Sequence, residues 1–196
     1  ATWPVNVALL VLLTARSCAV TFAPKFSAEA CKTVTVPPAV RSAFTATLPV
    51  KEFRDDRYIV MGTKKGIIKK TELSAFSNPR QGGIIALGLE SGDRLISVQL
   101  TDAQREILLG TRQGLTIRFK EEEVRSMGRT AYGVKGITLE EGNEVIGMET
   151  ITPDSTTSIL TVTEGGYGKR TPVGEYRIQG RGGKGITAMA VNDRHG

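Results

Sequence analysis

The stretch RYIVMGTKKGIIKKT, from Arg57 to Thr71, recurs twice further along this chain of 196 residues. The second copy is REILLGTRQGLTIRF, Arg105 to Phe119, and the third is SILTVTEGGYGKRTP, Ser158 to Pro172. In each copy a short apolar run ends at a threonine, two residues and a glycine follow, and a second short run begins. This pattern is typical of a β-hairpin whose turn glycine has a positive φ. The turn glycines are Gly66, Gly114 and Gly166, which lie 48 and 52 residues apart.

Two further elements follow the hairpins. The first is rich in glycine and basic residues and reads NPRQGGIIAL, GRTAYGVKGITL and QGRGGKGITAM, which aligns Ile84, Ile137 and Ile186. The second is an acidic turn before another strand, in LESGDRLISV and LEEGNEVIGM. No segment has a sustained helical period. We therefore predict an all-β chain of propeller-like, four-stranded blades of about 50 residues, three in all with the last truncated, so that the disc is incomplete.

Residues 1–47 differ in composition from the rest of the chain. All 22 glycines lie after residue 48, whereas both cysteines and the single tryptophan lie before it. The apolar run VNVALLVLLTARSCAV, residues 5–20, has three interpretations: a secretory signal, a buried helix or strand, or a segment that is not native to the protein. We treat residues 1–47 as an unmatched leader, non-native or disordered. We expect Leu9, Leu10, Leu12 and Leu13 to pack poorly against the blades.

The composition excludes several classes of function. Two cysteines, Cys18 and Cys31, provide neither a disulfide framework nor a zinc site. A single histidine, His195, leaves little scope for histidine-dependent catalysis or metal binding, so we expect no catalytic residue and no metal site. The RGGKG stretch at Arg181 lacks the Ser or Thr that would follow the lysine of a nucleotide phosphate loop. No apolar run reaches the roughly 18 residues of a membrane-spanning helix.

Basic residues recur at equivalent positions of the repeats, within a net charge of +6. They flank the hairpin turns and the glycine-rich elements, whereas the acids collect in the acidic turns. Stacked repeats would then carry a basic rim, which suits a curved polyanion held through its phosphates. The alternative is that these bases are ordinary solvated turn residues, and we interpret the Glu121-Glu122-Glu123 run as a solvated loop. The predicted DNA contacts are Lys64, Lys65, Lys69, Lys70, Arg80, Arg112, Arg118, Arg129, Lys135, Lys169, Arg170, Arg181 and Lys184.

The segment from about Leu48 to Gly196 resembles the C-terminal domain of the gyrase A protein of DNA gyrases. The resemblance is carried by LPVKEFRDDRYIVMGTKKGIIKKTELSAFSNPRQGGIIAL, VRSMGRTAYGVKGITLEEGNEVIGM and GYGKRTPVGEYRIQGRGGKGI. It implies a β-pinwheel, a propeller variant whose blades exchange a strand with their neighbours, and double-stranded DNA that wraps around the basic rim. It also implies that Gln179, Arg181 and Lys184 contact DNA. Gln179–Gly185 reads QGRGGKG, close to the family's QRRGGKG box, with Gly180 in place of the first arginine.

The position of this box is compatible with a main box or with a secondary copy. In the family the box usually lies in the first blade, whereas here it lies in the third repeat. It is therefore either the main box or a secondary copy of it. The corresponding protein of topoisomerase IV has a similar but more degenerate disc, and a protein-binding propeller is a further alternative. The near-complete box favours gyrase.

The resemblance further implies what the intact enzyme adds to this segment. A tyrosine in the N-terminal part of gyrase A cleaves DNA, and gyrase B hydrolyses ATP with Mg²⁺, in an A2B2 heterotetramer of the cytoplasm and nucleoid. We therefore expect a DNA-wrapping part of an ATP-dependent topoisomerase that negatively supercoils DNA. Alone, the segment is expected to need no cofactor and to catalyse nothing.

Overall fold

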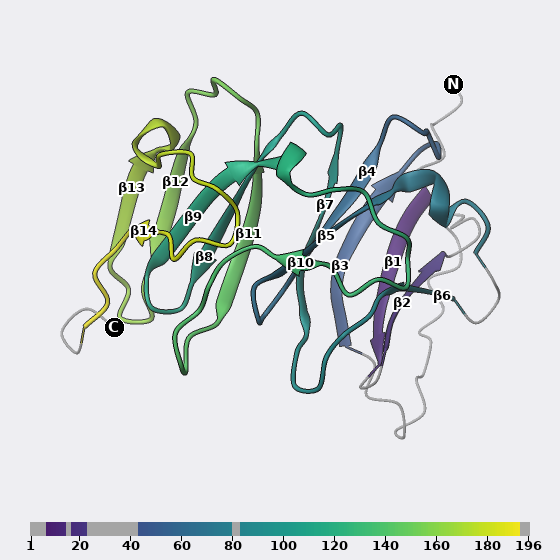
Figure 1. Ribbon diagram of the computed structural model, residues 1–196, viewed down its shortest axis with the longest axis horizontal. Helices are drawn as coiled ribbons and strands as arrows, with labels where there is room; N and C mark the ends of the chain where they lie inside the picture. Colours follow the sequence, from purple (N-terminus) through teal and green to yellow (C-terminus); the bar gives the residue numbers. More distant parts are fainter. Residues whose placement is uncertain (1–6, 15–16, 23–42, 80–82, 193–196) are drawn as a thin grey trace, which may run out of the picture.

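The computed structural model describes residues 7–14, 17–22, 43–79 and 83–192, and Figure 1 shows them as a row of small β-sheets. Besides strands, the regular elements in these ranges are three short 3₁₀ helices: η1 (Leu73–Phe76), η2 (Glu121–Glu123) and η3 (Val173–Glu175). The prediction of an all-β chain is therefore confirmed. The sheets follow one another along the chain, from β1 and β2 at one end of the row to β12 and β13 at the other (Figure 1).

The strands of the described residues form three four-stranded antiparallel sheets and one separate hairpin. The first sheet has the order β3 (Ala43–Val50), β1 (Val7–Thr14), β2 (Ser17–Phe22) and β6 (Ile84–Leu87). The second has the order β10 (Val134–Lys135), β5 (Ile67–Glu72), β4 (Tyr58–Thr63) and β7 (Leu95–Thr101). The third has the order β11 (Val145–Ile151), β8 (Glu106–Thr111), β9 (Leu115–Lys120) and β14 (Ile186–Thr187). The separate hairpin pairs β12 (Ser158–Val162) with β13 (Gly168–Pro172).

The three four-stranded sheets share one topology, in which the outer strand beside the second hairpin strand comes from the next repeat. In the second sheet, β4 and β5 form the hairpin and β7 pairs with β4, but β10 reaches β5 only after the chain has made the hairpin β8–β9. In the same way β6 pairs with β2, and β14 pairs with β9. Neighbouring blades therefore exchange a strand, as the resemblance to a β-pinwheel implied.

The three predicted hairpin turns have the same geometry. Gly66, Gly114 and Gly166 have φ values of 79°, 77° and 82°, which glycine adopts without the penalty of a Cβ atom. In each turn the threonine three residues earlier accepts two backbone hydrogen bonds. Its carbonyl accepts one from the glycine N–H at 3.0 Å, and its Oγ1 accepts one from the residue after the glycine. These threonines are Thr63, Thr111 and Thr163.

Each hydrophobic core lies between two consecutive sheets, so that a central sheet is buried on both faces. In β4, Ile59 and Met61 belong to the core against the first sheet, whereas Val60 points to the core against the third. Successive side chains of a strand point to opposite faces, so both faces must be apolar here. This explains the continuous apolar runs of the hairpins. The last core, around Leu108 and Tyr176, lies between the third sheet and the elements of the third repeat.

The exchanged strands correct one sequence alignment. Ile186 of β14 pairs with Thr116 of β9, and the residue at the same place in the second sheet is Val134, which pairs with Ile68. The predicted counterpart, Ile137, lies three residues further on. Here the positive-φ glycine before each exchanged strand is the better marker: Gly83, Gly133 and Gly185 have φ values of 81°, 109° and 83°.

Part of the leader has a place in the first sheet. The backbone of β1 pairs with β3, and that of β2 pairs with β6, which are the positions that β4 and β5 occupy in the second sheet. The predicted poor packing of Leu9, Leu10, Leu12 and Leu13 concerns side chains outside the described ones. The origin of residues 1–47 and their packing therefore stay a prediction.

Candidate nucleic-acid interface

The structure divides the predicted DNA contacts into buried, ion-paired and exposed bases. Arg80 lies outside the described residues. Lys69, Lys70 and Arg118 are buried within the strands β5 and β9. Lys64, Lys65 and Arg112 flank hairpin turns and are paired with carboxylates. The remaining predicted contacts lie on β13 or on the segments that lead into the exchanged strands.

Lys69 was predicted to contact DNA, and this prediction is wrong. The residue is 0% exposed, and its Nζ donates a hydrogen bond to the Ala86 carbonyl oxygen at 2.7 Å. A second bond goes to the carbonyl oxygen of Arg129. The ammonium thus ties the exchanged strand β6 to the segment before β10, and the side chain cannot reach a phosphate.

Lys70 and Arg118 are likewise buried, which corrects their prediction as DNA contacts. Arg118 donates from Nε to Glu106 Oε2 at 2.7 Å, and from Nη1 to the carbonyl oxygens of Val173 and Tyr176 at 2.8 and 2.9 Å. Lys70 donates to the Glu121 carbonyl oxygen at 3.2 Å, with its Nζ 5.4 Å from the ring centroid of Tyr58. Burial lowers the pKa of Lys70, and the negative charge of Glu121 opposes that shift.

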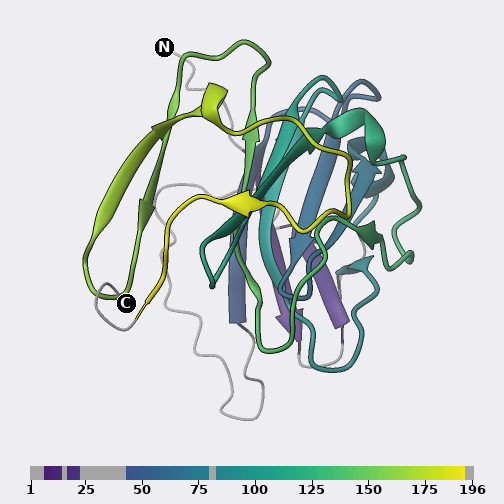
Figure 2. The same cartoon turned by 60° about the vertical axis from the view of Figure 1, so that its left-hand side comes forward.

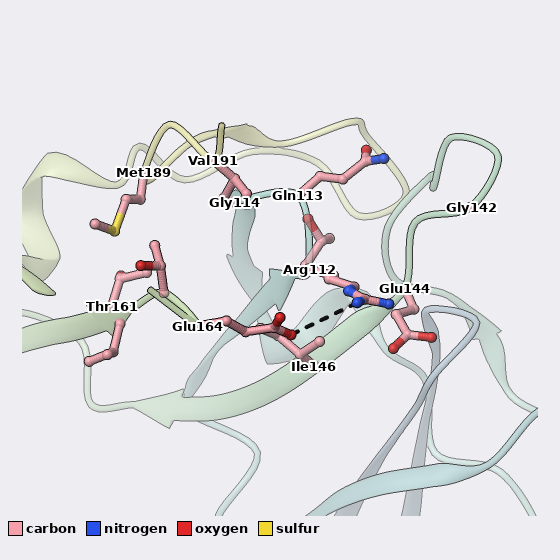
Figure 3. Close-up of a pocket in the computed structure, with 13 residues that line it drawn as sticks. Arg112, Gln113, Gly114, Gly142, Glu144, Ile146, Thr161, Glu164, Met189 and Val191 are labelled. Carbon is pink, nitrogen blue, oxygen red and sulfur yellow. Dashed lines mark ion pairs between the residues drawn. The ribbon is translucent and has the colours of Figure 1, made fainter. Parts of the chain in front are cut away.

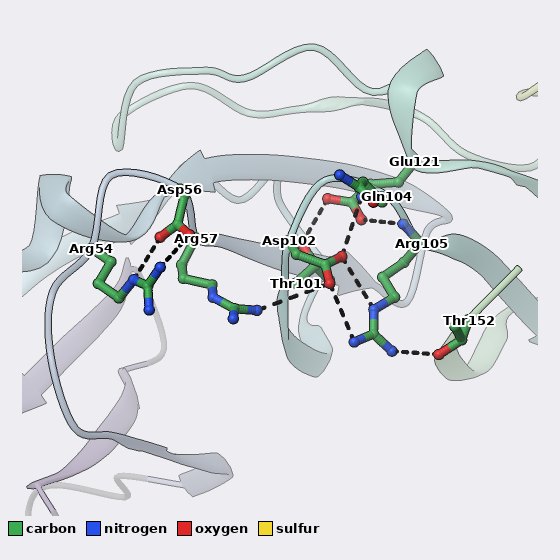
Figure 4. A network of polar contacts seen from close by, with 9 residues as sticks. All are labelled: Arg54, Asp56, Arg57, Thr101, Asp102, Gln104, Arg105, Glu121 and Thr152. Atoms are coloured by element: carbon green, nitrogen blue, oxygen red, sulfur yellow. Dashed lines mark hydrogen bonds and ion pairs between the residues drawn. The ribbon is translucent and has the colours of Figure 1, made fainter.

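Glu121 is also buried, so the expected solvated loop at residues 121–123 is wrong for its first member. Figure 4 shows its carboxylate between two donors: Thr101 Oγ1 donates to Oε1 at 2.6 Å, and the Arg105 backbone N–H donates to Oε2 at 3.2 Å. The Arg105 guanidinium continues the network, with bonds to Asp102 at 3.2 Å and to Thr152 at 2.7 Å. A buried carboxylate with donors on both oxygens is a structural group, in keeping with the rule that buried charges are paired.

The hairpin turns are not the predicted basic rim, because the acidic turns lie beside them. Lys64 pairs with Glu144, and this bond holds the pKa of the Glu144 carboxyl below its usual range. Lys65 lies 3.8 Å from Glu90, and its backbone N–H donates to Asp93 at 2.9 Å. The expected separation of acids from bases is therefore wrong at these turns. Their bases are largely neutralised by carboxylates.

A groove of about 610 Å³ lies between the third sheet and the hairpin β12–β13 (Figure 3). Its wall includes the apolar side chains of Ile146, Val162 and Val191. Its charged pair is Arg112 and Glu164, whose Nη2 and Oε1 atoms lie 3.8 Å apart. Arg112 thus faces a carboxylate across this groove.

One group of exposed basic residues lies on two segments that lead into and include the exchanged strands. We define the first exchange loop as residues 125–135 and the second as residues 177–187. They follow one another along one side of the row of sheets, as Figures 1 and 2 show, and the Gly182 N–H of the second loop donates to the carbonyl of Gly136, the residue after the first loop. Their predicted bases Lys135 and Lys184 are exposed, as are Lys169 and Arg170 on β13, whereas Arg129, Gln179 and Arg181 are half-buried.

Two exposed arginines were not among the predicted contacts. Arg125 and Arg177 are exposed, lie 52 residues apart and begin the two exchange loops. Among the described residues, neither guanidinium forms an ion pair. The spacing of 52, which also separates Gly114 from Gly166, was the available signal.

The second exchange loop contains the box-like stretch Gln179–Gly185. Its start is fixed by the Gln179 N–H, which donates to the Arg118 carbonyl oxygen at 2.8 Å. Lys184 projects outward, with its Nζ 3.5 Å from Glu140 in an exposed pair. Arg181 instead makes two hydrogen bonds to Glu123 and one to Lys135 of the first exchange loop. The Gln179 side-chain amide nitrogen is buried without a hydrogen-bond partner among the described residues. Of the three box residues, Lys184 is therefore the one that is fully exposed.

Within the described ranges, His, Cys, Asp and Glu residues nowhere gather in a group of three or more that could hold a metal ion. In the same ranges, no helix has both the length and the apolar character needed to cross a membrane.

Known proteins are similar to this chain in both sequence and fold. A family model described as DNA gyrase C-terminal domain, beta-propeller, matches residues 57–102, 105–152 and 157–196. The DNA gyrase A protein of Staphylococcus aureus strain MRSA252 is 48% identical over 142 residues, which cover 72% of this chain and 16% of that protein. The C-terminal domain of a DNA topoisomerase IV has a TM-score of 0.77 at 25% identity, over 93% of this chain and 58% of that chain. A DNA gyrase A C-terminal domain has a TM-score of 0.76 at 20% identity, over 100% and 64%, a likeness of fold alone.

Proposed function

Because the chain belongs to the DNA gyrase C-terminal domain family of β-propellers, we propose that it is the DNA-binding and DNA-wrapping part of a gyrase A protein. The chain spans 16% of the length of the gyrase A relative from Staphylococcus aureus. The activity of a whole enzyme is therefore part of the proposal: ATP-dependent negative supercoiling by an A2B2 assembly in the cytoplasm, associated with the nucleoid. In that assembly, DNA cleavage and the use of ATP and Mg²⁺ would belong to parts outside this segment.

The observation that carries the proposal is the repetition of exposed bases on consecutive exchange loops. Arg125 and Arg177 occupy the same position in two blades and form no ion pair with the described residues. Lys135 and Lys184 add exposed charge to the same two loops. A duplex that follows the row of blades would meet a similar set of cations at each blade. Such contacts neutralise phosphates and do not recognise nucleobases. Binding should therefore depend on how easily the DNA bends and not on one particular sequence.

A salt titration tests the binding part of the proposal. The affinity of the chain for a linear duplex should fall steeply as salt rises, because each phosphate contact releases counterions. Arg177→Ala should lower the slope of log K against log salt by about 0.9, the value for one lost contact. Arg54→Ala is the matched control, because this exposed arginine is already paired with Asp56 at 2.7 Å and its loss should leave the slope unchanged.

Ligation of a nicked circular plasmid tests the wrapping part. DNA that is wrapped when the nick is sealed keeps a change in linking number after the protein is removed, so topoisomers should shift in one direction as the chain is added. Binding without any shift would contradict wrapping. Binding that ignores salt would favour a protein-contact propeller.

A further inference from the structure

We propose that Arg181 is a positioning residue that joins the two exchange loops, and that Arg129, its structural counterpart, is free to contact phosphate. This inference rests on the proposed DNA-wrapping function. It assigns different roles to two arginines that occupy the same place in consecutive blades. Arg181 belongs to the box-like stretch by sequence, but its side chain bonds to the protein.

The equivalence of the two arginines follows from the backbone at both ends of the loops. At the start, the Met127 N–H donates to the Lys70 carbonyl and the Gln179 N–H donates to the Arg118 carbonyl, both at 2.8 Å. At the end, Gly133 and Gly185 both have positive φ, and a Cβ on either would lie 2.6 Å from a carbonyl oxygen of the strand beneath. Arg129 and Arg181 each lie two residues after the first anchor and four before the second. The two loops therefore have the same length and the same frame.

The second loop holds its arginine tightly. The Arg181 backbone N–H donates to Glu123 Oε2 at 2.7 Å, and its Nε donates to the Glu123 carbonyl oxygen at 3.3 Å. Its Nη1 donates to the Lys135 carbonyl oxygen at 2.6 Å. Lys135 belongs to β10, the strand exchanged into the second sheet, whereas Arg181 precedes β14, the strand exchanged into the third. The guanidinium thus links the second exchange loop to β10, and its Nε and Nη1 groups donate to protein carbonyl oxygens.

The first loop lacks the carboxylate that fixes the backbone of the second, where Glu123 accepts the Arg181 backbone N–H. The Leu73 N–H bonds to the Arg57 carbonyl as the Glu121 N–H bonds to that of Arg105, both at 2.8 Å, so η1 and η2 are equivalent. Ala75 then stands where η2 has Glu123. Among the described residues, the Arg129 guanidinium forms neither an ion pair nor a hydrogen bond. It is therefore available to an external anion.

Neighbouring contacts show what Arg181 positions. The Gly182 N–H donates to the Gly136 carbonyl at 2.8 Å, and Thr138 Oγ1 donates to the Gly182 carbonyl at 2.7 Å. These bonds fix the second loop against the end of the first, between the exposed bases Lys135 and Lys184. Wrapping needs phosphate contacts at a fixed spacing on successive blades, whereas binding of a short duplex needs only the charges. Loss of the Arg181 link should therefore affect wrapping much more than binding.

Arg181→Ala and Arg129→Ala, made in the full chain, test the assignment. Arg129→Ala should lower the salt slope for a short linear duplex by about 0.9 and reduce the linking-number shift in proportion to its weaker binding. Arg181→Ala should leave that slope unchanged, yet abolish most of the linking-number shift at protein concentrations that saturate the DNA. A salt slope that falls for Arg181→Ala as it does for Arg129→Ala would overturn the proposal, because it would make Arg181 a phosphate contact.

Two further measurements separate positioning from charge and from folding. Arg181→Lys keeps the charge but loses the paired donors, so it should recover only a minor part of the shift; full recovery would overturn the proposal. In thermal unfolding, Arg181→Ala should lower the midpoint more than Arg129→Ala, because of the two guanidinium groups only that of Arg181 donates to carbonyl oxygens of the described residues. This comparison does not depend on DNA. A wild-type chain that fails to wrap DNA would therefore refute the proposed function, whereas equal losses of stability for Arg181→Ala and Arg129→Ala would refute the Arg181 link.

Discussion

Lys70 and Arg118 occupy the same strand position in consecutive hairpins, and each is buried against the 3₁₀ helix of the following hairpin. Lys70 donates to Glu121 at the start of η2, and Arg118 donates to Val173 at the start of η3. Each cation therefore joins one blade to the next at a carbonyl that also accepts the N–H three residues further on. The same position on β13 holds Arg170, which is exposed in this chain. The repeat thus contains a basic residue for contact between blades, besides the exposed basic residues of the exchange loops.

Arg118→Ala should strongly destabilise the chain. The substitution leaves the buried Glu106 carboxylate without its partner and removes the donor to the Val173 and Tyr176 carbonyls. Removal of one member of a buried ion pair typically costs about 3–5 kcal/mol. Urea unfolding should show this loss as a lower midpoint with an unchanged m-value. Lys120→Ala, in the same strand but exposed, should change the midpoint little. A similarly small effect for Arg118→Ala would show that the buried Arg118 bonds do not stabilise the fold.

Glu144→Gln should remove part of the acid sensitivity of the fold. The hydrogen bond from Lys64 holds the pKa of Glu144 below its ordinary value of 4.5. A carboxyl with a lowered folded-state pKa binds more protons when unfolded, so its stabilising contribution is present above pH 4.5 and is lost as the pH falls through the folded-state pKa. The difference in unfolding free energy between wild type and Glu144→Gln should therefore shrink as the pH is lowered from about 7 to about 3. A difference that stays constant over that range would show that the pair contributes nothing.

The hairpins could be predicted from sequence because their signals are local. A turn glycine and the threonine before it lie within four residues of each other, and both are visible in every repeat. The strand exchange could not be derived from the repeat itself, because β10 and β5 are separated by a complete hairpin. It followed only from the family resemblance. The glycine-rich elements were misaligned by three residues at Ile137 for the same reason: the partner strand sets the register, not the motif.

The buried bases show why the site was only partly predictable. Lys69 and Lys70 are adjacent in β5, so they point to opposite faces of one strand, and a half-exposed sheet would leave one of them in solvent. Here sheets or loops cover both faces. The acceptors of Lys69 and Lys70 come from Ala86, Arg129 and Glu121, which are 17 to 60 residues away. A local sequence pattern contains no information on acceptors so far away in the chain. From the sequence, a buried basic residue of a strand therefore cannot be distinguished from an exposed one.

Lysine substitution on β12 should reduce self-association of the chain. Leu160 and Val162 are 66% and 59% exposed, and β12 pairs only with β13 among the described strands. An open strand edge with exposed apolar side chains is a template for pairing with another chain, and charged edge residues suppress such pairing. Leu160→Lys should therefore lower the apparent mass in sedimentation at high concentration. The matched control is Ile178→Lys, an exposed apolar residue that lies outside the named strands. Equal effects of both substitutions would assign the association to general hydrophobicity.

Gly114→Ala and Gly166→Ala should differ in stability although both glycines occupy the same turn position with almost the same φ, 77° and 82°. In either variant the alanine must adopt a left-handed conformation, which costs roughly 1–2 kcal/mol. At Gly166, no described atom lies within 4 Å of the new Cβ, so the cost should stop there. At Gly114, the Cβ would overlap the carbonyl oxygen of Met189, and the Gly114 carbonyl also accepts the Ala188 N–H at 2.9 Å. The clash would push the chain after β14 away from its turn and weaken the exchanged strand. Urea unfolding should therefore show a clearly larger loss for Gly114→Ala, by more than the backbone strain alone. Equal losses would mean that the contact between this turn and the chain after β14 does not contribute to stability.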